Sequence, residues 1–174
     1  DAGAVHILAV SGLHIGITTS GANQKEVIKA AIEVKVNDDE LFDSFQVTYN
    51  VFDQSSFSIL GDVLKQGKCV IIKEALANGR IFRNEKFQQY NKVYNILEAL
   101  SKKYEVGVDA IALRFIMDNL QPTYVLSGAS NKTHLKQNLK ALNFNFTLEE
   151  LKLLKTLKQA PESYWKERSS LNWN

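Results

Sequence analysis

The sequence is poor in the residues that mark several special classes of protein. Its 174 residues include one cysteine, Cys69, two prolines and nine glycines. A single cysteine excludes an internal disulfide framework and a zinc site made of several cysteines. Cys69 stands in an apolar run, so an inert core residue is expected. The chain also has no large excess of charge of one sign, since 21 basic and 19 acidic residues leave a net charge of +2. Nucleic acid is therefore not an expected partner.

Long hydrophobic runs are missing as well. The first sixteen residues, DAGAVHILAVSGLHIG, are apolar but hold no basic residue, which a secretory signal requires. They are also shorter than the roughly 20 apolar residues of a membrane span. A strand, a turn at Ser11 and Gly12 and a second strand is the simpler interpretation. We expect a cytoplasmic protein without membrane contact.

Alternating strands and helices are what the sequence does show. With 45% apolar and 23% charged residues, it is typical of a globular protein that can bury a core. Short apolar or alternating runs predict strands at residues 14–17, 41–49, 69–72 and 124–126. The third run, CVII, is continuous and β-branched, which is typical of a strand buried on both faces.

Stretches with helical spacing separate and follow these runs. Asn23 is placed to cap the first helix, Gly67 to end the second and Pro122 to stop the fourth. Thr147 begins a capping-box pattern, TLEE, before the last. The apolar residues of the predicted helices lie within 27–34, 59–64, 93–100, 108–116, 135–142 and 151–157. Residues 161–174 have no periodicity and are predicted as a tail.

This order of elements indicates parallel strands joined by right-handed crossovers. Such units either open into a doubly wound sheet or curl into a barrel. No G-x-G-x-x-G pattern follows a strand, which disfavours a dinucleotide-binding open sheet. A complete (β/α)8 barrel takes about 250 residues. About four βα units therefore predict an α/β fold containing part of a TIM barrel, with extra C-terminal helices.

Chemistry in either arrangement belongs at the C-terminal ends of the strands. The segment GASN at 128–131 stands there, and it opens a helix whose free N–H groups favour an anion. The same residues are also ordinary helix caps. Lys73 beside Glu74 is either a catalytic pair or a surface ion pair. No metal site is expected, because the three histidines have no metal-ligand spacing: His6, His14 and His134.

Five segments, in their order and spacing, resemble the C-terminal half of an aldo-keto reductase: LHIGITTSG, LFDSFQVTYNVFDQ, GKCVIIKEALANGR, VDAIALRF and VLSGASNKTHLKQNLKAL. That family is an eight-stranded barrel that uses NADPH, or less often NADH, to reduce carbonyl compounds to alcohols. The resemblance implies that the four strands are strands five to eight of the barrel. It places the half-barrel at residues 17–160, before the tail at 161–174.

The resemblance also implies two groups of cofactor contacts. Thr18 and Thr19 stand where the family has Ser-Asn at the nicotinamide carboxamide, and Gln46 matches a glutamine with the same role. Lys73 replaces an aromatic residue that often stacks under the nicotinamide. The second group surrounds the pyrophosphate and the adenosine: Leu76, Asn78, Gly79, Gly128, Ala129, Ser130, His134, Gln137 and Asn138. The basic residues usual there are missing, so a preference for the 2′-phosphate is doubtful unless Lys132 or Lys136 supplies charge.

The family's catalytic tyrosine, lysine, aspartate and histidine lie in the first half of the barrel, and nothing in this chain matches them. The tyrosine is the general acid toward the carbonyl. The resemblance therefore assigns no catalytic residue here, and Tyr49 and Tyr124 lie in other strands. Residues 1–16 depart from the family and resemble a signature stretch of competence proteins that form DNA-uptake channels. Since the chain also begins at Asp1, a junction or a fragment is expected.

Three functions follow from these observations. The leading one is a fragment of an NAD(P)H-dependent reductase of aldehydes and ketones that keeps the cofactor loops without the catalytic tetrad. The second is a non-catalytic, nucleotide-binding half-barrel that associates with another copy or a complementing half through its exposed sheet edges. The third is a remnant of a membrane DNA-uptake protein, which rests on residues 4–16 alone.

Overall fold

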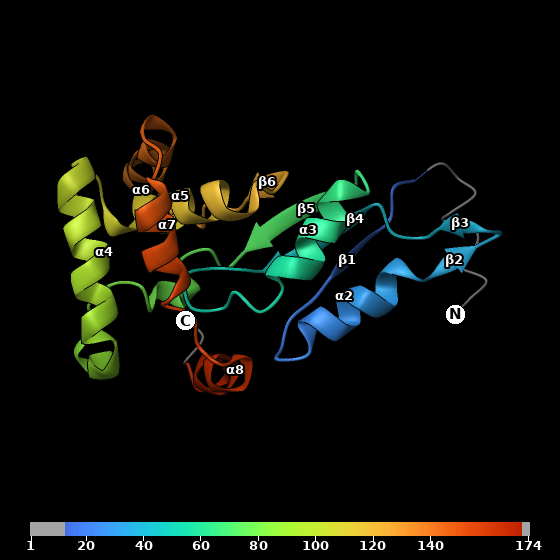
Figure 1. The fold of residues 1–174 in the computed structure, drawn as a ribbon, viewed down its shortest axis with the longest axis horizontal. Coiled ribbons are helices and arrows are strands. Elements are labelled where there is room, and N and C mark those ends of the chain that lie inside the picture. The colour runs from blue at the N-terminus through green and yellow to red at the C-terminus, as the bar shows by residue number, and fades with distance from the viewer. Residues whose placement is uncertain (1–12, 172–174) are drawn as a thin grey trace.

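A four-stranded parallel sheet forms the middle of the molecule in the computed structural model, which describes residues 13–171 (Figure 1). Its strands are β1 (Gly16–Thr18), β4 (Ser44–Thr48), β5 (Cys69–Lys73) and β6 (Tyr124–Val125), side by side in that order. Thr18 pairs with Gln46, Gln46 with Ile71, and Ile71 with Tyr124. The sequence therefore predicted the four strands and their parallel direction correctly.

Helices cover one face of this sheet. They include α2 (Gln24–Ile32), α3 (Phe57–Lys65) and α5 (Val108–Leu120), while α4 (Asn91–Tyr104) packs against α5 beyond the end of the sheet (Figure 1). The core side chains of β4 and β5 that face them are fully buried: Phe45, Val47, Val70 and Ile72. Tyr49, just past β4, stacks on Phe115 of α5 with ring centroids 6.3 Å apart. These contacts join the outer face of the sheet to its crossover helices.

The other face of β5 corrects two predictions. Cys69, Ile71 and Lys73 are only half-buried, so the strand is not buried on both faces, and Cys69 is not a core residue. Successive side chains of a strand point to opposite faces. The second face is the one that a closed barrel turns inward, and within residues 13–171 no further sheet layer packs on it.

A short hairpin, which the sequence analysis missed, follows α2 at one end of the molecule (Figure 1). It consists of β2 (Lys35–Val36) and β3 (Asp39–Glu40), paired antiparallel. Both turn residues, Asn37 and Asp38, have positive φ angles of 52° and 68°. Asn and Asp tolerate this conformation and favour tight hairpin turns. The dipeptide was thus a usable signal.

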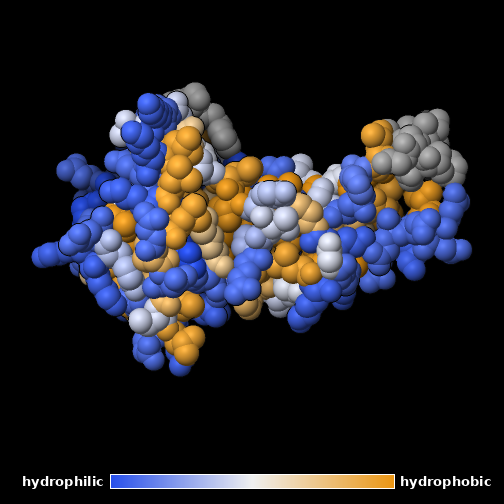
Figure 2. Space-filling model, turned by 90° about the horizontal axis from the view of Figure 1, so that it is seen from above, coloured by the Kyte–Doolittle hydropathy of each residue, from blue (hydrophilic) through white to orange (hydrophobic). Residues whose placement is uncertain are grey.

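The elements that directly follow β6 gather at the other end of the molecule, with α4 (Figure 1). They are α6 (Lys132–Leu139), the 3-10 turn η3 (Lys140–Asn143) and α7 (Leu148–Lys155). The predicted capping box of α7 is confirmed. The leucine side of α6 is exposed, with Leu135 and Leu139 45% and 51% accessible, and so is Leu142 of η3 at 63%. Seen from above, hydrophobic residues reach the surface over this end and along the middle of the molecule (Figure 2).

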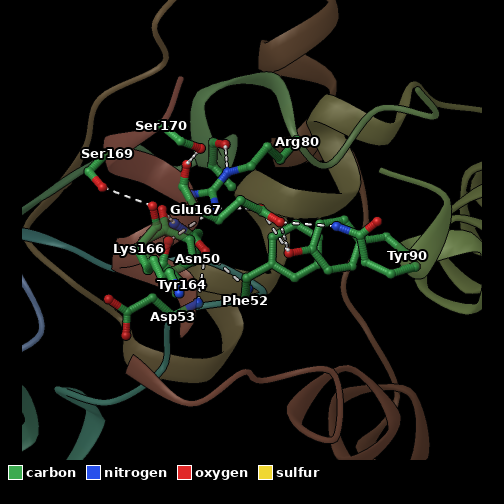
Figure 3. A network of polar contacts seen from close by, with 12 residues as sticks. Asn50, Phe52, Asp53, Arg80, Tyr90, Tyr164, Lys166, Glu167, Ser169 and Ser170 are labelled. Atoms are coloured by element: carbon green, nitrogen blue, oxygen red, sulfur yellow. Dashed lines mark hydrogen bonds and ion pairs between the residues drawn. The ribbon is translucent and has the colours of Figure 1, made fainter. Parts of the chain in front are cut away.

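The helix α8 (Pro161–Ser169) occupies most of the segment for which no regular structure was predicted. Pro161 stands in its first turn, where a missing N–H costs nothing. Tyr164 is fully buried and is part of the polar network of Figure 3. Contacts with remote residues, and not a periodic apolar face, hold this helix in place.

No helix among residues 13–171 is long and apolar enough to cross a membrane. Three earlier interpretations concern mainly residues 1–12, which lie outside the described part of the chain. They are the strand and turn predicted before residue 13, the role of His6, and the DNA-uptake resemblance. Those interpretations stay predictions.

Candidate functional site

Polar side chains from three neighbouring strands meet at the C-terminal edge of the sheet. The Lys73 Nζ atom donates to Ser20 Oγ at 2.6 Å and lies 3.3 Å from Thr18 Oγ1. Gln46 is the register partner of Thr18 on the same face. Its side-chain amide has no hydrogen-bond partner within residues 13–171. Three of the four residues expected at the nicotinamide are thus brought together, with a free amide among them.

Lys73 does not pair with Glu74, which corrects the surface ion pair considered from the sequence. Glu74 Oε1 accepts a hydrogen bond from Arg168 Nη2 of α8 at 2.6 Å. Lys73, the last residue of β5, lies over the open face. Glu74 lies past the end of the strand with a φ of +53°, and its side chain turns toward α8. Burial lowers the pKa of the Lys73 ammonium, with a further decrease from Arg168, while Glu74 acts in the opposite direction.

Thr19 takes a different orientation from Thr18. Its N–H donates to the Gln46 carbonyl at 2.9 Å, which extends the pairing of β1 and β4 by one residue. Its side chain is only 4% exposed, and the hydroxyl oxygen is buried without a partner in the described part of the chain. Thr18 therefore presents its hydroxyl to the open face, whereas the Thr19 hydroxyl points into the protein.

A cavity of about 400 Å³ gathers most of the second predicted group. Its walls come from the loop after β5, the start of α5, and the β6–α6 loop with α6. The lining residues are Leu76, Phe82, Gly107, Val108, Asp109, Gly128, Ala129, His134, Gln137 and Asn138. Six of these ten were predicted as cofactor contacts, although 52 positions of sequence separate Leu76 from Gly128. The fold therefore brings six of the nine residues of the second predicted group together around one cavity.

The loop before α6 is anchored to the helix by a hydrogen bond and has open space beside Gly128. Asn138 Nδ2 donates to the Ser127 carbonyl at 2.8 Å, which anchors the loop to the helix. Gly128 has a φ of +63°, and a Cβ atom there would meet no protein atom within 4 Å. A backbone in this conformation with open space beside it suits the close approach of a ligand.

Caps account for the remaining polar groups of this loop. Asn131 is the N-cap of α6, because its Oδ1 accepts from the His134 N–H at 2.9 Å. Ser130 Oγ lies 3.1 Å from His134 Nδ1 and does not line the cavity. The cap interpretation is thus confirmed for Asn131. Gly128 and Ala129 line the cavity, and anion binding by this segment stays a prediction.

Some positions differ from the prediction. Asn78 and Gly79, in the 3-10 turn η1 (Ala77–Gly79), do not line the cavity, while four residues that do were not predicted: Phe82, Gly107, Val108 and Asp109. The signal for three of them was the glycine that precedes α5, since a helix N-terminus is a polar site. Phe82 carried no comparable signal.

Other candidate groups lie elsewhere. Tyr49 is fully buried, its hydroxyl accepts from Asn119 Nδ2 at 2.5 Å, and burial raises the pKa of its phenol. Tyr124 lies on the edge strand β6 and is 61% exposed. His14 contacts Asp43 at 3.1 Å on the surface. Within residues 13–171, no three His, Cys, Asp or Glu side chains lie close enough to hold a metal ion.

Comparison with known proteins identifies the family of this chain. The sequence model of the Aldo/keto reductase family matches residues 2–159. The chain belongs to the aldo/keto reductase family. The resemblance inferred from the five sequence segments is thereby confirmed. A comparison with curated proteins finds no match.

Solved aldo-keto reductases share the fold over about half of their length. An aldo-keto reductase of Bacillus halodurans, AKR11C1, is 20% identical with a TM-score of 0.68, over 91% of this chain and 56% of its own. The thermostable aldo-keto reductase Tm1743, solved with the inhibitor epalrestat, is 24% identical with a TM-score of 0.63, over 89% and 53%. A putative 2,5-diketo-D-gluconic acid reductase B is 24% identical with a TM-score of 0.62, over 90% and 50%. The chain is thus a partial barrel that spans about half the length of these reductases.

Proposed function

We propose that this chain forms the cofactor-binding half of an NAD(P)H-dependent carbonyl reductase site. The observation that carries the proposal is the cavity of about 400 Å³, which is lined by six residues that were predicted as cofactor contacts. The family typically uses NADPH, and cofactor binding by this chain is the step proposed here. A bound nicotinamide cofactor would supply a hydride to a carbonyl carbon.

The residues present suit such a cofactor at both ends. At the nicotinamide end, the unpaired Gln46 amide and the exposed Thr18 hydroxyl offer donors and acceptors to a carboxamide. At the adenosine end, Gly128 and Ala129 line the cavity, and a Cβ atom at Gly128 would meet open space. Leu76 adds an apolar surface to the same cavity. We assign the carboxamide to the first set and the adenosine phosphates to the second.

The remaining predicted residues support the site in different ways. Asn138 keeps the phosphate loop on α6 through the Ser127 carbonyl, and His134 and Gln137 line the cavity beside it. Ser130, Asn78 and Gly79 flank the cavity loops, and Thr19 orders the end of β1 through its N–H. Lys73 places a half-buried ammonium group beside Thr18. A cation there favours an electron-rich group of the ligand.

Carbonyl reduction also requires a proton donor, and no residue of this chain matches the family's catalytic tyrosine. Tyr49 is buried and its raised phenol pKa makes it a poor donor. We therefore expect that reduced cofactor and a test aldehyde, added to the 174-residue chain, leave the nicotinamide absorbance unchanged. Robust turnover would refute this part of the proposal.

A pair of glycine variants tests binding directly. Gly128→Leu fills the space beside the phosphate loop, and Gly67→Leu makes the same change at a glycine of similar φ, +75°, that also faces open space but lies at the end of α3. Both substitutions place leucine at a positive φ angle and therefore cause a similar backbone strain. Equilibrium dialysis with NADH and NADPH should show binding to the unmodified chain and to Gly67→Leu, and at least a tenfold loss, about 1.4 kcal/mol, in Gly128→Leu. Equal affinities for the two variants would contradict the assignment.

A second candidate function is association through the sheet edges. The edge strands are β1 and β6, and large hydrophobic side chains beside them are exposed: Leu13, Tyr124 and Leu126, at 58%, 61% and 45%. Unpaired edges with apolar side chains favour pairing with another chain. The partner would be a second copy or a complementing half-barrel.

A further inference from the structure

The adenosine cavity contains a carboxylate that the function proposed above does not use. Asp109 lies in the first turn of α5, lines the cavity and is only 8% exposed. Its Oδ1 atom accepts a hydrogen bond from the Ala110 N–H at 2.9 Å. Its Oδ2 atom has no hydrogen-bond partner within residues 13–171. One carboxylate oxygen is therefore available to a ligand in the cavity.

Gly107 allows this carboxylate to take its position. A Cβ atom at residue 107 would collide with Asp109 Oδ1, so only glycine fits here without displacing the acid. The carboxylate thus folds back over the beginning of α5. A helix N-terminus normally attracts anions, but here the Ala110 N–H is already bonded to Asp109 and the Ile111 N–H to the Gly107 carbonyl. This helix end is consequently less able to bind a phosphate.

Among residues 13–171, no lysine or arginine lines the cavity beside Asp109. The ten lining residues include no lysine and no arginine. Lys132 and Lys136, considered from the sequence as sources of charge, are not among them. His134 lines the cavity, but its Nδ1 atom is engaged by Ser130 Oγ at 3.1 Å. Asp109 is thus the one carboxylate among the ten lining residues, and no lysine or arginine stands beside it in the wall.

We propose that Asp109 makes this cavity selective for an adenosine with a free 2′-hydroxyl group, so that the chain binds NADH in preference to NADPH. This inference rests on the proposed cofactor-binding function. A carboxylate accepts hydrogen bonds from ribose hydroxyls, as acidic residues do in other NAD-binding sites. The 2′-phosphate of NADPH carries negative charge at neutral pH, and like charges brought together in a partly buried site repel each other.

The test measures binding by isothermal titration calorimetry, without any turnover. The ligands are NADH and NADPH, together with 5′-AMP and adenosine 2′,5′-bisphosphate. The second pair lacks the nicotinamide half and differs only in the 2′-phosphate. The unmodified chain should bind NADH and 5′-AMP at least tenfold more tightly than their 2′-phosphorylated counterparts. Asp109→Asn keeps the shape and removes the charge, so the difference should shrink severalfold. Asp62→Asn, the same change on the exposed surface of α3, should leave it unaltered.

The outcomes separate this inference from the function on which it rests. Equal or tighter binding of the 2′-phosphorylated ligands to the unmodified chain overturns the selectivity while cofactor binding stands. Absence of binding by all four ligands overturns the proposed function and the selectivity with it. Circular dichroism checks that Asp109→Asn is folded. If that variant unfolds, the affinities of the unmodified chain for the ligands with and without a 2′-phosphate decide whether the selectivity exists.

Discussion

Glu150 shows at the scale of one residue how local contacts set a charge. It is the acidic partner of the α7 capping box, and it accepts hydrogen bonds from Lys103 Nζ at 2.7 Å and the Tyr104 hydroxyl at 2.6 Å. Burial acts to raise the pKa of this carboxyl, but the hydrogen bonds from Lys103, Tyr104 and Thr147 outweigh it and lower the pKa to about 2. The ionised form is therefore favoured by folding.

The sign of this shift gives a pH prediction. Because the folded pKa of about 2 lies below the ordinary value of 4.5, Glu150 stabilises the fold above pH 4.5, and the contribution is lost as the pH falls toward 2. Glu150→Gln retains a capping-box side chain and removes the charge. It should lower the free energy of unfolding by about 0.5–1 kcal/mol at neutral pH, since Lys103 is exposed. In thermal melts, the Tm difference from the unmodified chain should vanish as the pH approaches 2. A difference independent of pH would contradict this account.

The attachment of α8 shows how one element is fixed by others remote in sequence (Figure 3). Arg80, 1% exposed, donates from Nη1 to Glu167 Oε1 at 2.8 Å, and its guanidinium lies 4.2 Å from the centre of the Tyr164 ring. Asn50 Nδ2 donates to the Tyr164 hydroxyl at 2.9 Å. The loops after β4 and β5 thus hold α8 against the edge of the sheet where the candidate site lies.

Two arginine substitutions test this attachment. Arg80→Met leaves the Glu167 carboxylate without its buried partner and should lower the free energy of unfolding by about 3–5 kcal/mol. Arg83→Met is the matched control, because Arg83 also pairs with a glutamate, Glu98, at 2.7 Å, but both side chains are nearly half exposed. Its loss should stay within about 1 kcal/mol. Urea denaturation measures both values, and similar losses would show that burial of the Arg80 pair contributes little.

Element-scale contacts also explain what sequence patterns can and cannot predict. The strands β4 and β5 follow from their own apolar and β-branched residues, and α7 follows from its capping box. The helix α8 was not predicted because its stability comes from Asn50 and Arg80, which the sequence separates from it by more than 80 positions. The surface pairing of Lys73 with Glu74 was wrong because Glu74 turns to Arg168 of α8.

At the scale of the whole molecule, part of the candidate site could likewise be predicted from the sequence and part could not. The loop at Gly128, which lines the cavity, was selected as a candidate phosphate loop from its small residues and the following helix. Asp109 was not, because only the fold brings the start of α5 against that loop. The open inner face of the sheet is likewise a property of the assembled molecule, since the spacing within each strand does not show what covers it.

Association through the sheet edges is a prediction for the whole molecule. Sedimentation velocity should find the unmodified chain larger than a monomer. Tyr124→Lys places a charge on the edge strand β6 and should shift the chain toward the monomer. Leu148→Lys, at a leucine of α7 that is 71% exposed and lies off the sheet edge, should leave the sedimentation unchanged. A monomer for the unmodified chain would exclude this candidate function.

The central claim is that a nicotinamide cofactor binds at the edge of this half-barrel, in the cavity beside Gly128. The most direct measurement is a titration of the isotope-labelled chain with NADH, followed by backbone amide chemical shifts. The account predicts saturable shifts at Gly128, Ala129 and Asn138, and at Asp109 across the cavity. Shifts confined to other surfaces, or no shifts at saturating NADH, would contradict it.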